Sequence, residues 1–438
     1  MIKFHVSSIL TPIILLFLTA VLGGCGAESP RSTPQSNETG DLFSASLSSR
    51  SDTSYSYKAI YPDDSLDPDS LVIGLDAAMS GDFAKSGVAI WRGIVLAVDE
   101  LNESGGVDGR RLQIVVRDHR ANPDRGVENI KSFAEQNQLL AVMGGMHTPV
   151  LMNELPVIHS ENLISLVPWA AGTSIVDNDY DPNNVFRLSI RDEHAGPFIV
   201  EKLAKAGYER PALMLENTSW GRSNFKSLTS ALNEHGLKES SVEWFNWGEP
   251  SFEDNITQAR EKGADAIIFV GNAPEGATLV QSMTQFESDQ RLPIVSHWGI
   301  TGGQFFQQVE SELSRITLHV IQTDGLLSPG GPNQQQFISR YCSRFDCSGK
   351  GSEAIFAPVG TSHAYDLVHL LARAANQSDT FTTNSIRRQL ENLGRWQGIV
   401  RKYDRPFTHV NREALSISDY TLARYNDDGA LVPAELDQ

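Results

Sequence analysis

The sequence predicts an α/β protein with two similar domains, each a mostly parallel sheet flanked by helices, and three observations support this. From residue 70 onward, short β-branched and apolar runs alternate with longer segments of helical periodicity. The short runs are apolar throughout, which is typical of strands covered on both faces. The pattern extends over roughly 370 residues, a length that suits two domains better than one sheet.

The first domain opens with a strand and a long helix. Residues 71–75 form a continuous apolar run, and a helix is expected over about 86–103, where Ile90, Ile94 and Val98 share one face. The Gly-Gly-Val-Asp-Gly cluster at 105–109 predicts a turn. Further strands are expected at 112–116, 139–143 and 163–167, and further helices at 123–136 and 150–160.

The second domain repeats this alternation. Strands are expected at 211–215, 242–244, 266–270 and 294–296, and helices at 194–206, 219–235, 252–262 and 274–286. In sheets of this kind, ligands bind beyond the carboxyl ends of the strands. The candidate binding segments are therefore the loops 76–86, 144–149, 168–174, 216–223, 271–275 and 296–302.

Residues 1–24 predict a lipoprotein signal peptide. Lys3 is followed by an apolar run, densest at 13–22, that is shorter than the roughly 20 residues needed to span a bilayer. Leu22-Gly23-Gly24-Cys25 resembles a bacterial lipobox, which implies cleavage before Cys25, a lipid on its thiol and a membrane-anchored location outside the cytoplasm. The alternative is a plain signal peptide with an incidental cysteine. Residues 25–69, poor in apolar residues and rich in Ser, Thr, Asp and Pro, predict a disordered tether.

Two further cysteines, Cys342 and Cys347, are close in sequence within Tyr-Cys-Ser-Arg-Phe-Asp-Cys. Because an export signal implies an oxidising compartment, we expect a local disulfide rather than two free thiols. The bond would close a very short loop, so its effect on stability should be modest.

Composition and missing motifs exclude several classes of function. The chain of 438 residues carries 36 Lys and Arg against 54 Asp and Glu, a net charge of -18, so it should repel nucleic acid. Phosphate-loop, dinucleotide, zinc-protease, nucleophile-elbow and CxxC motifs are missing from the sequence, so we expect no enzyme, no cofactor and no metal site. Asp192-Glu193-His194 has the composition of a solvated, acidic helix start rather than of a catalytic cluster. His147 and His297 lie in candidate loops and are expected as polar wall residues.

Residues 73–118 resemble the opening of type I periplasmic binding proteins of the leucine/isoleucine/valine-binding family. The motifs that carry the resemblance are Met79-Ser80-Gly81, Gly87, Trp91-Arg92-Gly93, Leu101-Asn102, the glycine cluster 105–109 and Asp118. The resemblance continues through 141–145, 163–169, 185–190, 208–215, 219–221 and 263–271, and covers about residues 70–400. It implies two lobes joined by three crossovers, with a ligand captured between them by hinge closure.

The resemblance also implies ligand-binding positions. The family holds an amino acid's carboxylate with a hydroxyl at a helix start, which falls on Thr148, next to His147. A helix N-terminus with free N–H groups is a physically sound carboxylate site. The remaining positions are the backbone groups of Trp169, Ala170 and Ala171, and the aromatic side chains of Phe83 and Trp220.

The sequence departs from the family where the ligand ammonium would bind. The loop that usually carries an acid reads Ser296-His297-Trp298-Gly299, and a buried ammonium without a counter-charge is costly. Glu275 is a candidate substitute, although an acid in the first turn of a helix is the more ordinary role for it. The ligand is therefore not required to carry an ammonium.

Aromatic residues suggest a different kind of ligand. Trp298, together with the tryptophans at 169 and 220 and the phenylalanine at 83, would form an aromatic cage for a flat or apolar molecule. Packing in the core or between lobes is the alternative role for each of them.

These observations predict a monomeric, lipid-anchored solute-binding protein that delivers an amino acid or related small molecule to the membrane subunits of an ABC permease. Lobe 1 is expected at 70–190 plus about 323–380, and lobe 2 at about 191–322 plus 381–438. Two alternatives remain: a ligand-sensing module for a receptor or kinase, and a lipoprotein that binds no small ligand and regulates cell-wall enzymes.

Overall fold

The computed structural model describes residues 66–323 and 325–436. The predicted signal peptide, Cys25 and most of the predicted tether lie outside these residues. Residues 66–69, also assigned to the tether, are hydrogen bonded to the folded part: the Asp67 amide donates to Gln113 Oε1 at 2.8 Å, and Arg110 Nε donates to Asp69 O at 2.6 Å. The structured region therefore includes residue 66.

Lobe 1 is built on a parallel sheet with the strand order β2-β1-β3-β4-β5. Its strands are β1 (Leu71–Ala77), β2 (Leu112–Asp118), β3 (Leu139–Met143), β4 (Ser165–Val167) and β5 (Val185–Arg187). Every residue of β1 is buried, as expected for a central strand with helices on both faces. The carboxyl ends of all these strands therefore lie at one edge of the sheet.

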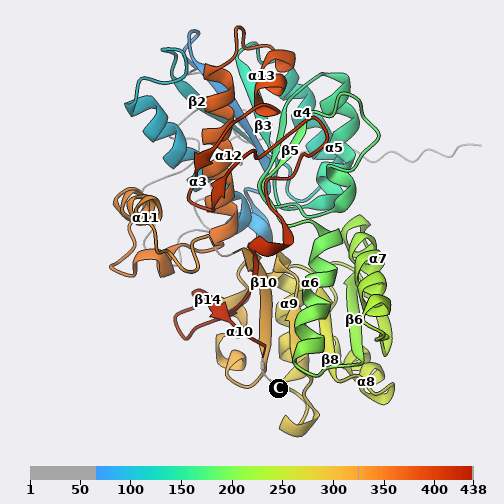
Figure 1. Ribbon diagram of the computed structural model, residues 1–438. Helices are drawn as coiled ribbons and strands as arrows, with labels where there is room; N and C mark the ends of the chain where they lie inside the picture. The colour runs from blue at the N-terminus through green and yellow to red at the C-terminus, as the bar shows by residue number, and fades with distance from the viewer. Residues whose placement is uncertain (1–65, 324, 437–438) are drawn as a thin grey trace, which may run out of the picture. The chain divides into compact units, whose positions relative to one another are not determined.

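Helices cover both faces of this sheet (Figure 1). They are α3 (Ala84–Glu103), α4 (Pro123–Ala134), α5 (Thr148–Ser160), α12 (Pro358–Asn376) and α13 (Thr383–Leu390). Ile130 and Phe133 of α4 pack with Val72 on one face, whereas α3 packs on the other face together with α12. Gly93 makes the close approach of α3 to α12 possible, because a Cβ there would lie 2.1 Å from Thr361 O.

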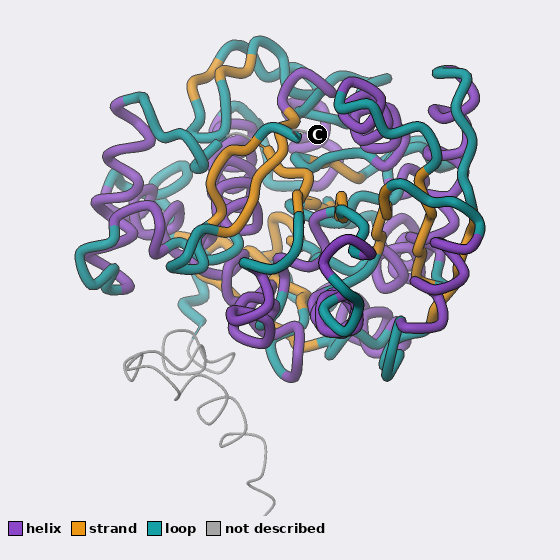
Figure 2. Tube along the Cα trace, turned by 90° about the horizontal axis from the view of Figure 1, so that it is seen from below, coloured by secondary structure: helices purple, strands orange, loops and turns teal. Residues whose placement is uncertain are grey.

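Lobe 2 is built on a sheet with the order β14-β13-β10-β9-β8-β6-β7. Its parallel strands are β6 (Pro211–Glu216), β7 (Ser241–Phe245), β8 (Ala266–Val270), β9 (Ile294–Ser296) and β10 (Leu318–Thr323), and its antiparallel strands are β13 (Tyr420–Tyr425) and β14 (Leu431–Ala434). The helices are α6 (Asp192–Lys205), α7 (Ser219–Glu234), α8 (Glu253–Glu261), α9 (Ala273–Met283) and α10 (Phe305–Leu313). Figure 2 shows the described helices and strands of the chain from below, coloured by type.

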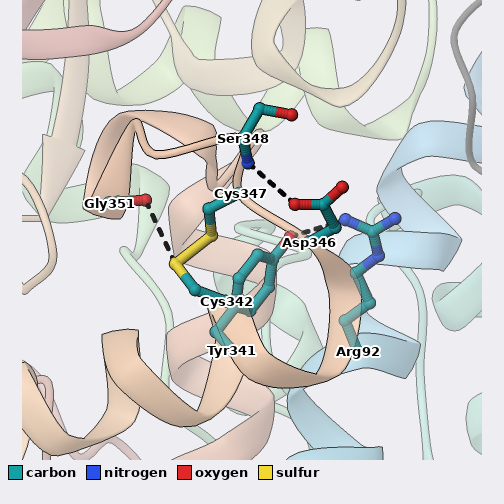
Figure 3. The surroundings of a disulfide bond; sticks show 7 residues. All are labelled: Arg92, Tyr341, Cys342, Asp346, Cys347, Ser348 and Gly351. Atoms are coloured by element: carbon teal, nitrogen blue, oxygen red, sulfur yellow. Dashed lines mark hydrogen bonds between the residues drawn. A yellow bond between two sulfur atoms is a disulfide. The ribbon is translucent and has the colours of Figure 1, made fainter.

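Helix α11 (Pro332–Phe345) packs beside α3, and the predicted disulfide joins a cysteine in its last turn to a cysteine just after its end. Cys342 and Cys347 are joined, with their Cα atoms 4.8 Å apart (Figure 3). Arg92 of α3 donates from Nη1 to the Tyr341 hydroxyl at 2.7 Å, and its guanidinium lies 4.8 Å from the Phe345 ring centre. The disulfide therefore closes the end of a helix that is fixed to lobe 1.

Short elements complete the described chain. The 3-10 turns are η2 (Gly81–Phe83), η3 (Thr173–Ile175), η4 (Ser288–Gln290), η5 (Trp298–Gly302), η6 (Gly351–Ala354) and η7 (Ile417–Asp419), and a small ribbon pairs β11 (Trp396–Gln397) with β12 (Lys402–Tyr403). Across residues 66–323 and 325–436, no helix has both the length and the apolar character that crossing a membrane requires.

The chain passes between the lobes after β5, after β10 and before β13. The prediction that 381–438 belongs to lobe 2 is wrong for its first part. Asp366 of α12 accepts from the Ile399 and Val400 amides, each at 3.0 Å, and the Phe407 ring lies 5.1 Å from Phe186. These contacts hold residues up to about 413 on lobe 1, and the last crossover comes just before β13.

Candidate interlobe binding site

The loops at the carboxyl ends of the strands of lobe 1 contact those of lobe 2. Lys85 Nζ donates to Gln307 Oε1 at 2.8 Å, and the Thr173 amide donates to Ser223 Oγ at 3.3 Å. A Cβ on Gly302 would lie 2.3 Å from Met146 Sδ. The two loop sets therefore form the walls of an interlobe site in which the lobes already touch.

Thr148 starts α5 directly after the loop that follows β3. Its side chain is buried, and its Oγ1 accepts from the Gly172 amide at 3.2 Å, which joins this loop to the loop after β4. Pro149 fits the first turn, where a missing N–H costs nothing. The hydroxyl and the positive end of α5 therefore lie in the lobe 1 wall.

The carbonyl groups of residues 169–172 all accept hydrogen bonds from β5 or from the crossover that follows it. Trp169 O accepts from Ser189 Oγ at 2.6 Å, and Ala171 O accepts from the Asp192 amide at 3.0 Å. Arg187 Nη1 donates to Ala170 O at 3.3 Å and to Gly172 O at 2.7 Å. Within the described ranges, the N–H groups of residues 169–171 make no hydrogen bond, so they remain available as donors.

Arg187 is wholly buried, and its charge is balanced by the last crossover. Its Nε donates to Glu413 Oε2 at 2.9 Å, and its Nη2 also pairs with that carboxylate. The backbone is joined at the same place, because the Ala414 amide donates to Arg187 O at 2.9 Å. Arg187 therefore links the 169–172 loop to two interlobe crossovers, a role for which the sequence offers no local motif.

Asp192 is part of the lobe 2 wall, and the prediction of a solvated side chain is wrong for this residue. Asp192 does begin α6, but it is fully buried. Its Oδ1 accepts from Trp220 Nε1 at 3.2 Å and lies 3.2 Å from His297 Nε2. The Trp298 amide donates to His297 Nδ1 at 3.0 Å, so Nδ1 is the acceptor nitrogen of this ring. The neighbouring Glu193 side chain is 58% exposed, as predicted.

Trp169 and Trp298 meet from opposite lobes beside the crossover that follows β10. Their ring centres are 6.2 Å apart in an edge-to-face arrangement, and both side chains are buried. His363 lies 6.0 Å from Trp298 and bonds Pro168 O at 2.8 Å and Thr323 Oγ1 at 3.0 Å; burial lowers its pKa to about 4. These two tryptophans therefore pack on each other at the hinge.

Phe83 belongs to a separate aromatic group, so the structure does not bring the four predicted cage residues into one cluster. Phe83 lies edge-on to His147 at 4.7 Å. Trp247, which the sequence analysis overlooked, lies 6.0 Å from Phe83 and 5.9 Å from His147. Burial lowers the pKa of His147, so its imidazole is neutral near pH 7. Trp247 follows strand β7, and the rule that ligands bind beyond strand ends would have found its loop.

Two carboxyl groups of lobe 2 bind Trp247 or the residue next to it. Glu275, in the first turn of α9, is buried and accepts from the Gly248 amide at 2.9 Å; burial raises its pKa. Glu216, also overlooked, ends β6 and accepts from Trp247 Nε1 at 3.0 Å and Asn272 Nδ2 at 2.9 Å. Burial raises the pKa of Glu216 to about 7 despite these donors.

Buried polar atoms without a partner remain on both walls. Among the described residues, they include both ring nitrogens of His147 and Nε1 of Trp169 in lobe 1, and Oδ2 of Asp192 and Oε2 of Glu275 in lobe 2. Such atoms are costly unless a ligand or water satisfies them. The described residues contain no group of three or more ligating side chains suited to a metal ion. The site can therefore bind a ligand that accepts hydrogen bonds from lobe 1 and donates them to lobe 2.

The comparisons with known proteins agree with this architecture. Residues 70–430 match the family model described as periplasmic binding protein. A protein named amino acid binding protein from Pseudomonas aeruginosa is 26% identical over 219 residues, 49% of this chain and 57% of that protein. The Leu/Ile/Val-binding protein homolog 1 of Brucella suis is 23% identical over 336 residues, 75% of this chain and 84% of that protein.

A solved structure has the same fold. It is the branched-chain amino acid transporter substrate-binding protein of Streptococcus pneumoniae in complex with isoleucine. Its TM-score is 0.68 at 20% identity, and the match covers 84% of this chain and all of that one.

Proposed function

The chain belongs to the periplasmic binding protein family, and from this premise we propose that it captures an amino acid between its lobes and delivers it to an ABC permease. Proteins of this family bind solutes and are not enzymes, and the family places the chain outside the cytoplasm. A lipid on Cys25 would hold the protein at a membrane, where a permease lies within reach.

The distribution of unpartnered polar atoms carries the proposal that the ligand is an amino acid. Lobe 1 offers donors: the N–H groups of residues 169–171, which make no hydrogen bond, and the unpartnered Trp169 indole, beside the Thr148 hydroxyl at the start of α5. Lobe 2 offers the acceptors Asp192 Oδ2 and Glu275 Oε2. A carboxylate fits the first wall and an ammonium fits the second, so a zwitterion satisfies both.

The loop at 296–299 leads us to expect no acid that could pair with a ligand ammonium, but Asp192 and Glu275 offer carboxyl groups elsewhere in lobe 2. That loop lacks an acid, but it contributes His297, which lies against the Asp192 carboxylate. The counter-charge for a ligand ammonium is therefore available from the start of α6 rather than from the loop after β9. This supports a ligand that carries an ammonium.

A lipoprotein that binds no small ligand is the second candidate, and one observation favours it. Trp169 and Trp298 fill the hinge end of the interlobe site with protein side chains. That candidate leaves the unpartnered atoms at His147, Asp192 and Glu275 without an explanation.

A thermal-shift screen of the full chain separates these candidates. The panel holds the common amino acids and, for each hit, the matched carboxylic acid without an amino group and the matched amine without a carboxylate. A zwitterion at a hundredfold excess over its Kd should stabilise the chain by about 2.7 kcal/mol, whereas neither matched compound should. If no compound raises the melting temperature, the amino acid proposal fails and the non-binding lipoprotein is favoured.

Two variants of Thr148 test the carboxylate anchor by calorimetry with the amino acid found in the screen. Thr148→Ala removes the hydroxyl and should weaken binding by roughly 10- to 100-fold, because a hydrogen bond to a charged group contributes about 1.5–3 kcal/mol. Thr148→Ser keeps the hydroxyl and should bind almost as the unaltered chain does. Equal affinity of all three proteins would remove Thr148 from the site.

A further inference from the structure

Trp247 extends from lobe 2 onto lobe 1, although it lies in the loop after the edge strand β7. Its ring is tilted at 6.0 Å from Phe83 and stands edge-on at 5.9 Å from His147. The side chain is still 37% exposed, which is unusual for a tryptophan and shows that it is not part of the core of lobe 2.

The loop that carries Trp247 is fixed to lobe 2 by hydrogen bonds. The indole Nε1 donates to Glu216 Oε2 at 3.0 Å, and the Gly248 amide donates to Glu275 Oε1 at 2.9 Å. The Asn217 amide donates to Phe245 O at 2.7 Å, just before the loop. Both carboxyl groups are buried, so the loop is held at two points in the interior of lobe 2.

The surface that Trp247 meets on lobe 1 is equally well defined. Phe83 ends the turn η2 and packs on His147, and His119 lies 5.6 Å from His147 on a neighbouring loop. His119 and His147 are buried, whereas Phe83 is only partly buried. Trp247 therefore rests on a preformed aromatic surface.

We propose that Trp247 is the closing residue of the interlobe site: it docks on the Phe83–His147 pair and stabilises contact between the lobes by interactions within the chain alone. Contact between the lobes before ligand binding raises the fraction of binding-competent protein, so less of the ligand's binding energy is used to bring the lobes together. The proposal rests on the contacts between the lobes and not on the identity of the ligand.

The neighbouring Trp244 provides a matched control. It is the same residue type, lies on the edge strand β7 itself and is 39% exposed, but it packs on Phe225 of its own lobe at 5.7 Å. Its removal therefore deletes a similar ring without touching the interlobe contact.

Amide hydrogen exchange of the ligand-free full chain tests the proposal. In Trp247→Ala, exchange should be faster by about threefold or more in the lobe 1 segments 82–88 and 144–152, because opening of the lobes exposes them. Trp244→Ala should leave both segments unchanged. The proposal is overturned if neither variant changes lobe 1 or if both change it equally.

A variant on the opposite lobe keeps the proposal testable if Trp247→Ala destabilises the whole chain. Phe83→Ala removes the docking surface from lobe 1 and should accelerate exchange at 245–249 in lobe 2. Unchanged exchange at 245–249 in that variant contradicts docking. Because no ligand is present, these results are independent of the amino acid screen.

Discussion

For Asp192, the sequence correctly predicts the start of a helix but wrongly predicts a solvent-exposed side chain. Its position before an amphipathic segment predicts a helix start, and α6 does begin there. Its burial comes from Trp220 and His297, which lie 28 and more than 100 residues further along the chain. No local pattern contains that information, so the sequence could not identify Asp192 as a site residue.

Asp192→Asn should weaken binding of the amino acid found in the screen by about tenfold or more, because it removes the charge facing the ligand ammonium. Binding of any carboxylate that lacks an ammonium should be little changed. Isothermal titration calorimetry of the two ligand types measures the difference. Glu193→Gln, which removes the neighbouring exposed acid, is the control. A similar loss in both variants would assign the effect to overall charge.

At the scale of elements, the ion pair of Arg187 and Glu413 joins strand β5 to the last crossover. Arg187→Met leaves the Glu413 carboxylate, whose side chain is only 9% exposed, with no cation closer than Arg191 Nη1 at 3.8 Å. The free energy of unfolding should fall by about 3–5 kcal/mol. Urea denaturation followed by circular dichroism measures this.

The exposed pair of Arg395 and Asp404 is the matched comparison, since its side chains are 70% and 75% exposed. Arg395→Met should change the free energy of unfolding by less than about 1 kcal/mol. If the two variants cost the same, the buried pair has no special role in the fold.

Another element-scale prediction concerns pH and the carboxyl groups of Asp76 on β1 and Glu154 on α5. Both side chains are buried, and one oxygen of each carboxyl group has no hydrogen-bond partner, so the pair is favoured when it holds a proton. Burial raises the pKa of Glu154 to about 7, and burial together with the Glu154 carboxyl raises the pKa of Asp76. The folded state thus binds the proton more tightly, so this stabilisation is complete below about pH 4.5 and is lost as pH rises through about 7.

Glu154→Gln keeps a neutral, hydrogen-bonding group and should remove this loss. Relative to the unaltered chain, its free energy of unfolding should rise by on the order of 1–3 kcal/mol between pH 4 and pH 8. Urea titrations at several pH values give the difference. The exposed Glu161→Gln, near the end of the same helix, should show no such trend, and a flat difference for Glu154→Gln would contradict the shared proton.

At the scale of the whole molecule, neither lobe is a continuous piece of chain. Strand β13 pairs with β10 in lobe 2, although the residues between them build α11, α12 and α13 of lobe 1. Both lobes should therefore unfold together in one transition, with urea midpoints from far-ultraviolet circular dichroism and tryptophan fluorescence that agree within about 0.2 M. Two separate transitions would show that the lobes are independent.

The sequence predicts the first two thirds of this architecture well and the last third poorly. The strand expected at 139–143 is β3 to the residue, and the helix expected at 219–235 is α7 within one residue. These segments have strong periodicity and clear turn residues at their ends. Beyond residue 296 no element was predicted, and 381–413 was assigned to the wrong lobe, because that assignment depends on distant contacts such as those of Asp366 with 399 and 400.

The bound carbonyls of residues 169–172 have a consequence for redesign of this protein. Each is held by Ser189, Arg187 or the Asp192 amide, so a substitution that shifts this loop would also disturb the hinge. The loop around Trp247, by contrast, follows an edge strand and is partly exposed. A designer who wishes to change which solute is retained should therefore leave the 169–172 backbone untouched and vary the side chains near Trp247 instead.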